Sequence, residues 1–215
     1  NGTASLVARR SNWRGGVEIR YQPVPNGPAT MMTAELATGA ALSVLHGGAD
    51  QVYLFNYFPS GHGLTKDWGA ETIDSVFRAM KDATAMAKLA RRHAITYRDI
   101  RAPGEPLDNA LPGSDLQADM PSPSGCAFRI NTGPIPVGRI VELLLEFQQG
   151  GIDPSQLRVH VNSQQCAIKQ SSDDGVAIYN VPCELMEDES QVVDVIGGGK
   201  NAFTIVRVEV SVSAA

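Results

Sequence analysis

The sequence predicts an α/β part followed by an all-β part, namely the last two strand-helix units of a (β/α)8 barrel and then a β-sandwich. Three observations support this order. A strand, a helix and a second strand follow one another over residues 17–58, another helix comes next, and the second half of the chain holds short β-rich runs. Alternating strands and helices form the repeating unit of (β/α) folds, whereas short strands separated by turn residues are typical of sandwiches.

The first strand-helix unit consists of a strand over Val17–Gln22 and a helix over Thr30–His46. Gly15-Gly16 is expected to open the strand, and a loop rich in proline and glycine closes it. The helix is expected because apolar residues recur every four positions, at Met32, Leu36, Ala40 and Val44. The pair Gly47-Gly48 is expected to end this helix by supplying a residue with positive φ.

The second unit consists of a strand that includes residues 52–55 and ends at Asn56 and Tyr57, and of a helix from Glu71 to about Arg91. The strand is apolar on both faces, which is typical of a strand covered by helices on one side and by a packed interior on the other. The helix has apolar residues at i, i+3, i+4 and i+7, and a break near Asp82 with a short second helix is expected. Arg91-Arg92 is expected to cap its last carbonyls.

Two segments of this region resemble a known protein family. The segments read HGGADQVYLFNYF and, after a helix, HAITYRDI followed by PGEPL and LP. They are similar to the end of the TIM-barrel domain in glycoside-hydrolase-like proteins, in which a β-rich domain follows the barrel. The resemblance covers roughly the first half of the chain, and its most specific piece is Ala49–Asn56. It implies that carbohydrate is the substrate.

The two units account for only part of a barrel. A complete barrel has eight units and about 250 residues, whereas this chain has 215 residues and begins at Asn1 rather than at a methionine. We therefore expect a C-terminal piece of a longer protein, with the remainder of the barrel or another chain completing it. The expected organisation is a barrel portion over 1–105, a linker over 106–124 and a β-sandwich over 125–215.

The expected linker and sandwich follow from a change in composition. Five prolines lie between Arg101 and Pro123, where helical periodicity is lost. Beyond them, β-rich runs separated by turn residues occupy 128–130, 140–147, 157–161, 176–179 and 203–212. In the last run, Ile205, Arg207, Glu209 and Ser211 alternate with valines, so one buried face is expected.

Composition excludes two classes of partner. The chain is 43% hydrophobic and 19% charged, with a formal net charge of −5 and scattered basic residues. A nucleic-acid surface would need a clustered positive patch, so no nucleic-acid partner is expected. A membrane span would need about 20 consecutive apolar residues, so no membrane partner is expected either.

The cysteine pattern predicts no metal site. Cys126, Cys166 and Cys183 show none of the spacings that hold zinc, and no metal or cofactor is expected. Cys166 and Cys183 flank an expected hairpin and could pair in an oxidising compartment, leaving Cys126 free. Buried free thiols are at least as well supported. Localisation stays open, with a secreted or periplasmic one favoured.

Candidate carbohydrate-binding residues lie at the expected strand ends and in the loop that follows them. A sugar needs hydrogen-bonding partners and flat apolar faces, which amide, imidazole and aromatic side chains provide. An alternative is that the aromatic residues are core and that the polar residues satisfy loop backbone or lie exposed. The candidates are Tyr21, Gln22, Asn56, Tyr57, His62 and Trp68.

Glycoside hydrolysis uses a pair of carboxylates, and the sequence identifies no catalytic residue with that role. Glu18 and Asp50 are placed near the starts of their expected strands, whereas barrel chemistry occurs at the C-terminal ends. Glu18 is therefore expected to form an ion pair with Arg20 or a neighbouring strand, and a nucleophilic role is the less favoured alternative. His93 and His160 have no recognisable partner for triad catalysis.

Two functional hypotheses follow. In the first, the chain is the C-terminal portion of a glycoside hydrolase whose catalytic acid and base lie outside it. In the second, the β-sandwich is a non-catalytic module that binds carbohydrate or packs against the barrel portion. Whether the chain takes part in hydrolysis of O-glycosyl bonds is thus left uncertain by the sequence.

Overall fold

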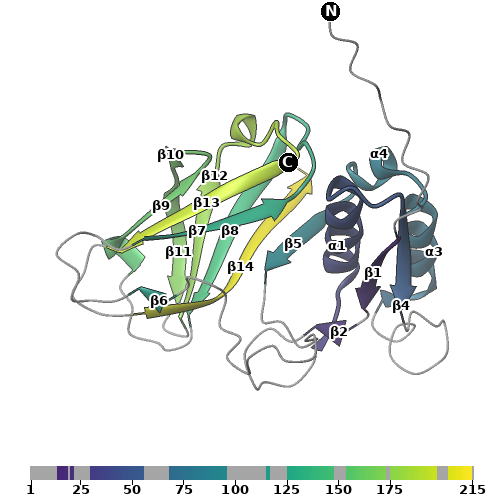
Figure 1. Cartoon of the computed structure of the whole chain (residues 1–215), viewed down its shortest axis with the longest axis horizontal. Coiled ribbons are helices and arrows are strands. Elements are labelled where there is room, and N and C mark those ends of the chain that lie inside the picture. Colours follow the sequence, from purple (N-terminus) through teal and green to yellow (C-terminus); the bar gives the residue numbers. More distant parts are fainter. Residues whose placement is uncertain are drawn as a thin grey trace, which may run out of the picture.

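The computed structural model describes residues 14–18, 20–21, 30–55, 68–95, 115–116, 125–147, 154–172, 175–197 and 203–214. They form a helical part and a β-sandwich, which meet where helix α1 packs beside strand β5 (Figure 1). Within these residues, no helix combines the length and apolar character needed to cross a membrane.

The helical part contains the two expected strand-helix units. Its elements are β1 (Arg14–Glu18), β2 (Arg20–Tyr21), β3 (Thr30–Met31), α1 (Ala34–His46), β4 (Gln51–Phe55), α3 (Ala70–Ala79) and α4 (Ala83–Met86). Strands β1 and β4 pair in parallel, and β2 pairs with β3 antiparallel. The parallel pair fits a β-α-β unit, in which the intervening helix returns the chain to the same end of the sheet.

Helix α1 begins at Ala34 rather than at the expected Thr30, because Thr30–Met31 pair with β2 as strand β3, and it ends at the expected glycine pair. Thr33 is its N-cap and accepts a hydrogen bond from the Leu36 amide at 3.3 Å. Gly47 is the C-cap, and Gly48 has the expected positive φ of 98°. The helix buries Ala37, Ala41 and Leu42 against the other helices and strands of this part. Local signals thus set both ends of α1.

Strand β1 differs from the expected Val17–Gln22. It begins at Arg14 and ends at Glu18, because Gly15 and Gly16 pair with Val52 and Tyr53 of β4 instead of forming a turn. Gln22 lies outside the described residues.

The long helix expected from Glu71 to about Arg91 is divided. Helix α3 ends at Ala79, α4 begins after its N-cap Asp82, and Arg91–Ile95 form strand β5. The break near Asp82 is confirmed, whereas the expected continuation of the helix to Arg91 is wrong. Arg91 still contacts a helix end, because its Nη1 donates a hydrogen bond to the carbonyl of Ala87, the C-cap of α4, at 2.7 Å.

The second half of the chain forms the expected β-sandwich. One sheet has the strand order β10-β9-β13-β7 and the other has the order β11-β12-β8-β14-β5, with β6 pairing β14 as well. Short 3-10 turns, η1 and η2, connect some strands. The elements are β5 (Arg91–Ile95), β6 (Asp115–Leu116), β7 (Gly125–Asn131), β8 (Arg139–Phe147), η1 (Pro154–Gln156), β9 (Leu157–Val161), β10 (Gln164–Gln165), β11 (Ala167–Ser172), β12 (Val176–Val181), η2 (Cys183–Leu185), β13 (Ser190–Gly197) and β14 (Phe203–Ala214).

The sandwich core is built from alternate residues of facing strands. On β14, Val208, Val210 and Val212 enter the core, as the period of two predicts. A register shift between Ile205 and Arg207 brings Ile205 into the same core, out of step with the valines. The opposite face of β14 carries the buried carboxylate of Glu209, which pairs with Arg207 and with Arg92 of β5.

Strand β5 joins the sandwich although it precedes the expected linker. It pairs antiparallel with β14, from Val208 opposite Ile95 to Val212 opposite Arg91. Residues 91–95, which the sequence assigned to the barrel portion, are therefore part of a sandwich sheet. Of the expected linker 106–124, only Asp115–Leu116 is described, and it pairs with Phe203–Thr204. The boundary itself stays a prediction.

The cysteines are free thiols. Cys126 and Cys166 are buried and Cys183 is partly buried, so the alternative of a bond between Cys166 and Cys183 is not realised. Burial raises the pKa of Cys126 to about 11 and also raises the pKa of Cys166. Cys126 and Cys166 therefore behave as small core residues, which agrees with the alternative that the cysteines are buried free thiols.

Candidate functional site

The first candidate site is the C-terminal edge of the parallel pair β1 and β4. The register places Arg14 opposite Gln51 and Glu18 opposite Phe55, so both strands end at the same edge. Asn56 directly follows Phe55 in the sequence. In (β/α) folds the functional loops leave from this edge, because the strands run in one direction and their helices return the chain to the other.

The two faces of this pair have different surroundings. Val17 is 2% exposed and belongs to the core formed with α1 and α3, against which Val52 and Leu54 pack. Tyr53, between those two residues on β4, is 54% exposed. Since successive strand residues alternate between faces, the helices cover the face of Val17, and the face of Tyr53 is the opposite one.

Glu18 lies at the edge where chemistry is expected, contrary to the sequence interpretation. It is the last residue of β1, not one near its start, because the strand begins at Arg14. By alternation from Val17, position 18 belongs to the face opposite the helices. The expectation that Glu18 occupies the wrong end of its strand is therefore wrong. Asp50 does precede β4 and lies at the other edge, as expected.

Most of the predicted carbohydrate-binding residues cannot be placed around this edge. Tyr21 is in β2, where it pairs with Thr30. Gln22, Asn56, Tyr57 and His62 lie outside the described residues, and their roles stay predictions.

Trp68 occupies a core position. It is 9% exposed, belongs to the helical core, and its indole Nε1 donates a hydrogen bond to the carbonyl of Met32 at 2.8 Å. This placement favours the alternative that the ring packs in the core, because a ring that stacks on a sugar needs an accessible face. Its role in binding remains a prediction.

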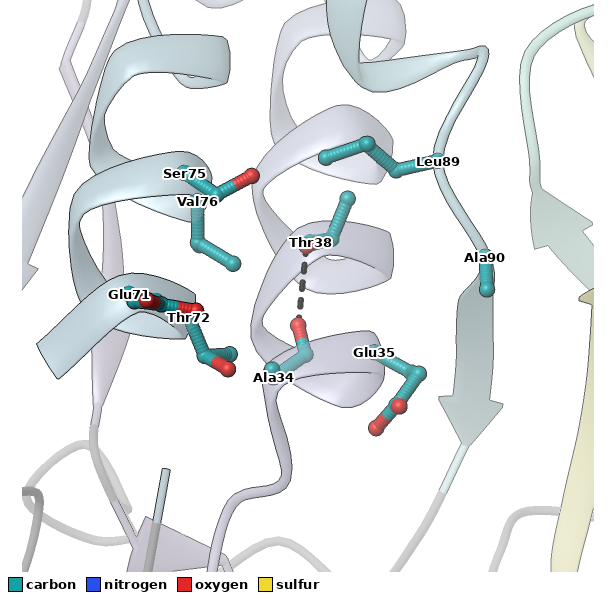
Figure 2. Close-up of a pocket in the computed structure, with 9 residues that line it drawn as sticks. All are labelled: Ala34, Glu35, Thr38, Glu71, Thr72, Ser75, Val76, Leu89 and Ala90. Carbon is teal, nitrogen blue, oxygen red and sulfur yellow. Dashed lines mark hydrogen bonds between the residues drawn. The ribbon is translucent and has the colours of Figure 1, made fainter. Parts of the chain in front are cut away.

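A cleft of about 320 Å³ lies between α1, α3 and the segment that leads from α4 to β5 (Figure 2). Its lining includes the exposed carboxylates Glu35 and Glu71 and the hydroxyls of Thr38, Thr72 and Ser75. Thr38 is already engaged, because its hydroxyl donates to the carbonyl of Ala34 at 2.8 Å. The cleft belongs to the helix layer.

A buried polar cluster joins α1 to both sheets of the sandwich. Ser43 Oγ of α1 donates to the carbonyl of Asn131 on β7 at 2.5 Å and lies 2.9 Å from Nδ1 of His93 on β5. Nε of Arg91 donates to Nε2 of His93 at 3.1 Å. No local sequence pattern signals this contact, because Ser43 and His93 are 50 residues apart and only the fold brings them together.

These hydrogen bonds define the proton on the imidazole. The carbonyl of Asn131 can only accept, so the Ser43 hydroxyl donates to it and must itself accept from Nδ1–H of His93. The guanidinium of Arg91 can only donate, so Nε2 of His93 carries no proton. The ring is therefore neutral, with its proton on Nδ1.

The cluster is unsuited to nucleophilic catalysis despite its serine-histidine contact. His93 is 1% exposed, and burial, Arg91 and His46 lower its pKa to about 3. A base with that pKa does not deprotonate a serine hydroxyl near neutral pH. Nδ1 also donates to the serine, which is the reverse of the direction that a general base requires. The expectation that His93 forms no catalytic triad stays a prediction.

Arg91 adds a second feature to the cluster. Its side chain is buried, and burial followed by the charge of Arg139 lowers its pKa to about 10. Its Nη2 has no hydrogen-bond partner among the described residues. Among the residues that the structure describes, no three or more histidine, cysteine, aspartate or glutamate side chains are grouped so that they could hold a metal ion.

No protein-family model and no curated protein matches the sequence. Among solved structures, the chain is similar to BuGH86 in complex with neoagarooctaose, at 11% identity and a TM-score of 0.36 over 57% of this chain and 19% of that one. It is also similar to BpGH86A, a β-porphyranase of glycoside hydrolase family 86 from the human gut bacterium Bacteroides plebeius. There the identity is 9% and the TM-score 0.37, over 59% of this chain and 21% of that one. The chain thus spans about a fifth of each of these proteins.

Proposed function

We propose that this chain is the C-terminal portion of a glycoside hydrolase in which β1, α1, β4 and α3 are the last two strand-helix units of a (β/α)8 barrel. We further propose that Glu18 is one of the two catalytic carboxylates. One observation carries this proposal. Glu18 ends a strand that is parallel to its neighbour, on the face that the helices do not cover.

The chemistry of glycoside hydrolysis fits a carboxylate at that place. Glycosidases hold the scissile bond between two carboxyl groups, of which one protonates the leaving oxygen and the other attacks the sugar or activates water. Barrel enzymes position such groups at the C-terminal ends of their strands. Glu18 would supply one group, and the other would come from a strand end outside this chain. In a retaining enzyme, the Glu18 carboxylate would be the nucleophile.

The remaining predicted site residues would surround this carboxylate. Gln22 and Tyr21 follow β1 within a few residues, and Asn56 and Tyr57 directly follow β4. Both groups would reach the same edge, because the two strands end together. They would supply hydrogen bonds and an aromatic face to the sugar. His62 would join them from the loop after β4.

The test is the substitution Glu18→Gln in the native protein, assayed on a panel of agarose, porphyran, cellulose and xylan by release of reducing ends. A substrate hydrolysed by the unmodified protein should be hydrolysed more than about a thousandfold more slowly by the variant, because loss of a catalytic nucleophile has effects of that size or larger. The melting temperature should stay nearly unchanged.

The matched control is Glu187→Gln, which removes the same charge from an exposed residue between η2 and β13 of the sandwich. Its turnover should equal that of the unmodified protein.

With Glu18→Ala, added azide should restore turnover of an activated glycoside and yield a glycosyl azide, because the small anion replaces the lost nucleophile. Full activity of Glu18→Gln would contradict the catalytic role.

A second candidate function is a structural role for the β-sandwich. The observation that favours it is the part-buried contact of Ser43 with both His93 and Asn131, through which the sandwich packs against helix α1. A module built only to bind glycan would need no such contact. Removal of residues 125–215 should then lower the solubility of the remaining portion, rather than only its affinity for glycan.

A further inference from the structure

Helix α1 closes one open side of the sandwich. Strands β5 and β7 are the edge strands of the two sheets, and α1 packs beside both of them (Figure 1). The approach to β5 is close, because a Cβ atom added to Gly39 would lie 1.9 Å from the carbonyl oxygen of Arg92. Glycine is required there, since a side chain would overlap the backbone of β5.

The contact is specific as well as close. Ser43 belongs to α1, and its hydroxyl bonds both the backbone of β7 and the ring of His93. Because Nδ1 of His93 donates to Ser43 while Nε2 accepts from Arg91, the ring can hold only one orientation. The rotation and height of α1 relative to the sandwich are therefore set at this point.

Helix α1 in turn sets the position of strand β4. Only four residues, 47–50, separate them, and the amides of Gly47 and Ala49 bond the carbonyls of Ser43 and Val44 at 2.8 and 3.2 Å. Val52 and Leu54 of β4 pack in the same core as α1. A shift of α1 away from the sandwich would thus move β4 and the edge that it shares with Glu18.

We propose that His93 is a positioning residue for the site at the C-terminal edge of β1 and β4. From the sandwich, it orients Ser43 and with it α1, and α1 holds β4 in register with β1. This inference rests on the proposed function for its catalytic consequence. In this proposal the sandwich helps to position strand β4 through His93 and α1, and it does not itself contact the substrate.

Two variants of His93 separate positioning from simple packing. In His93→Asn, the amide nitrogen lies about where Nδ1 was and can still donate to Ser43. In His93→Gln, the amide lies about where Nε2 was, so the bond to Arg91 can be kept while the bond to Ser43 is lost. Both variants remove the imidazole from a buried place, and both should lower the melting temperature.

The kinetic readout is kcat and KM of the native protein, assayed well below the melting temperature on the polysaccharide hydrolysed by the unmodified protein. His93→Gln should lower kcat by roughly tenfold to 100-fold with little change in KM, because small displacements of reacting groups have effects of this size. His93→Asn should restore most of kcat. Equal kcat values in the two variants would overturn the inference.

A second readout needs no substrate. Amide hydrogen exchange in β4 should be faster in His93→Gln than in His93→Asn, since only the former frees α1 from the sandwich. Equal exchange in the two variants would overturn the inference whatever the result for Glu18→Gln. Faster exchange in His93→Gln, together with full activity of Glu18→Gln, would instead support the positioning link and refute the proposed catalytic carboxylate.

Discussion

The sandwich and the parallel pair β1 and β4 bury their strands in different ways. In the sandwich, two sheets face each other, and residues such as Leu143 and Val193 are fully buried between them. In the parallel pair, helices cover one face, while Tyr53 on the other face is 54% exposed. The comparison shows that the sandwich encloses its own core, whereas the described strands of the helical part have one face covered by helices and the other carrying an exposed tyrosine.

The largest expected effect comes from the core of the helical part. Trp68→Ala should lower the free energy of unfolding by about 3–5 kcal/mol, because it removes a buried aromatic ring and a hydrogen bond to Met32. Thermal unfolding measures this. Asn56→Ala should instead leave the melting temperature nearly unchanged and weaken glycan binding by up to about tenfold. A stable Trp68→Ala variant with weakened binding would assign the ring to the site.

The contact between the two parts can be broken at one residue. Gly39→Ala should lower the free energy of unfolding by about 1–3 kcal/mol, because the new methyl group overlaps the Arg92 carbonyl and α1 must move. Gly125→Ala is the matched control, since its added Cβ would lie 3.3 Å from the nearest atom, the carbonyl oxygen of Val195. If both variants melt alike, then α1 and the sandwich are less closely joined than proposed.

The pH dependence of stability tests the same contact. The pKa of His93 is lowered from 6.5 to about 3 in the folded chain, so the unfolded chain binds the proton first. Stability should therefore fall as pH decreases from about 6.5 toward about 3, by at most about 1.4 kcal/mol per pH unit. Urea unfolding across this range measures the slope. His93→Asn should flatten it, and an unchanged slope would assign the acid sensitivity to other groups.

Parts of the candidate site could be predicted from the sequence and parts could not. The strand that ends at Phe55 was predictable from its apolar run and the glycine pair before it, and so was the parallel order of β1 and β4. The position of Glu18 at the end of β1 was missed because Gly15-Gly16 was expected to open the strand, although both residues already pair with β4. The weak strand propensity of glycine was overridden by a neighbouring strand, which no local window contains.

The sequence by itself determined the periodic elements of this protein. A period near 3.6 predicted α1 and α3, a period of two predicted β14, and Gly47-Gly48 predicted the end of α1, because each depends only on neighbours along the chain. Only the tertiary structure decided that Arg91–Ile95 form a strand of the sandwich. Arg91 and His93 are polar and would be expected at the surface, but they are buried through bonds to Ala87, Ser43 and each other. The decisive partner, Ser43, is distant in sequence, and bonds of that kind exist only once the chain has folded.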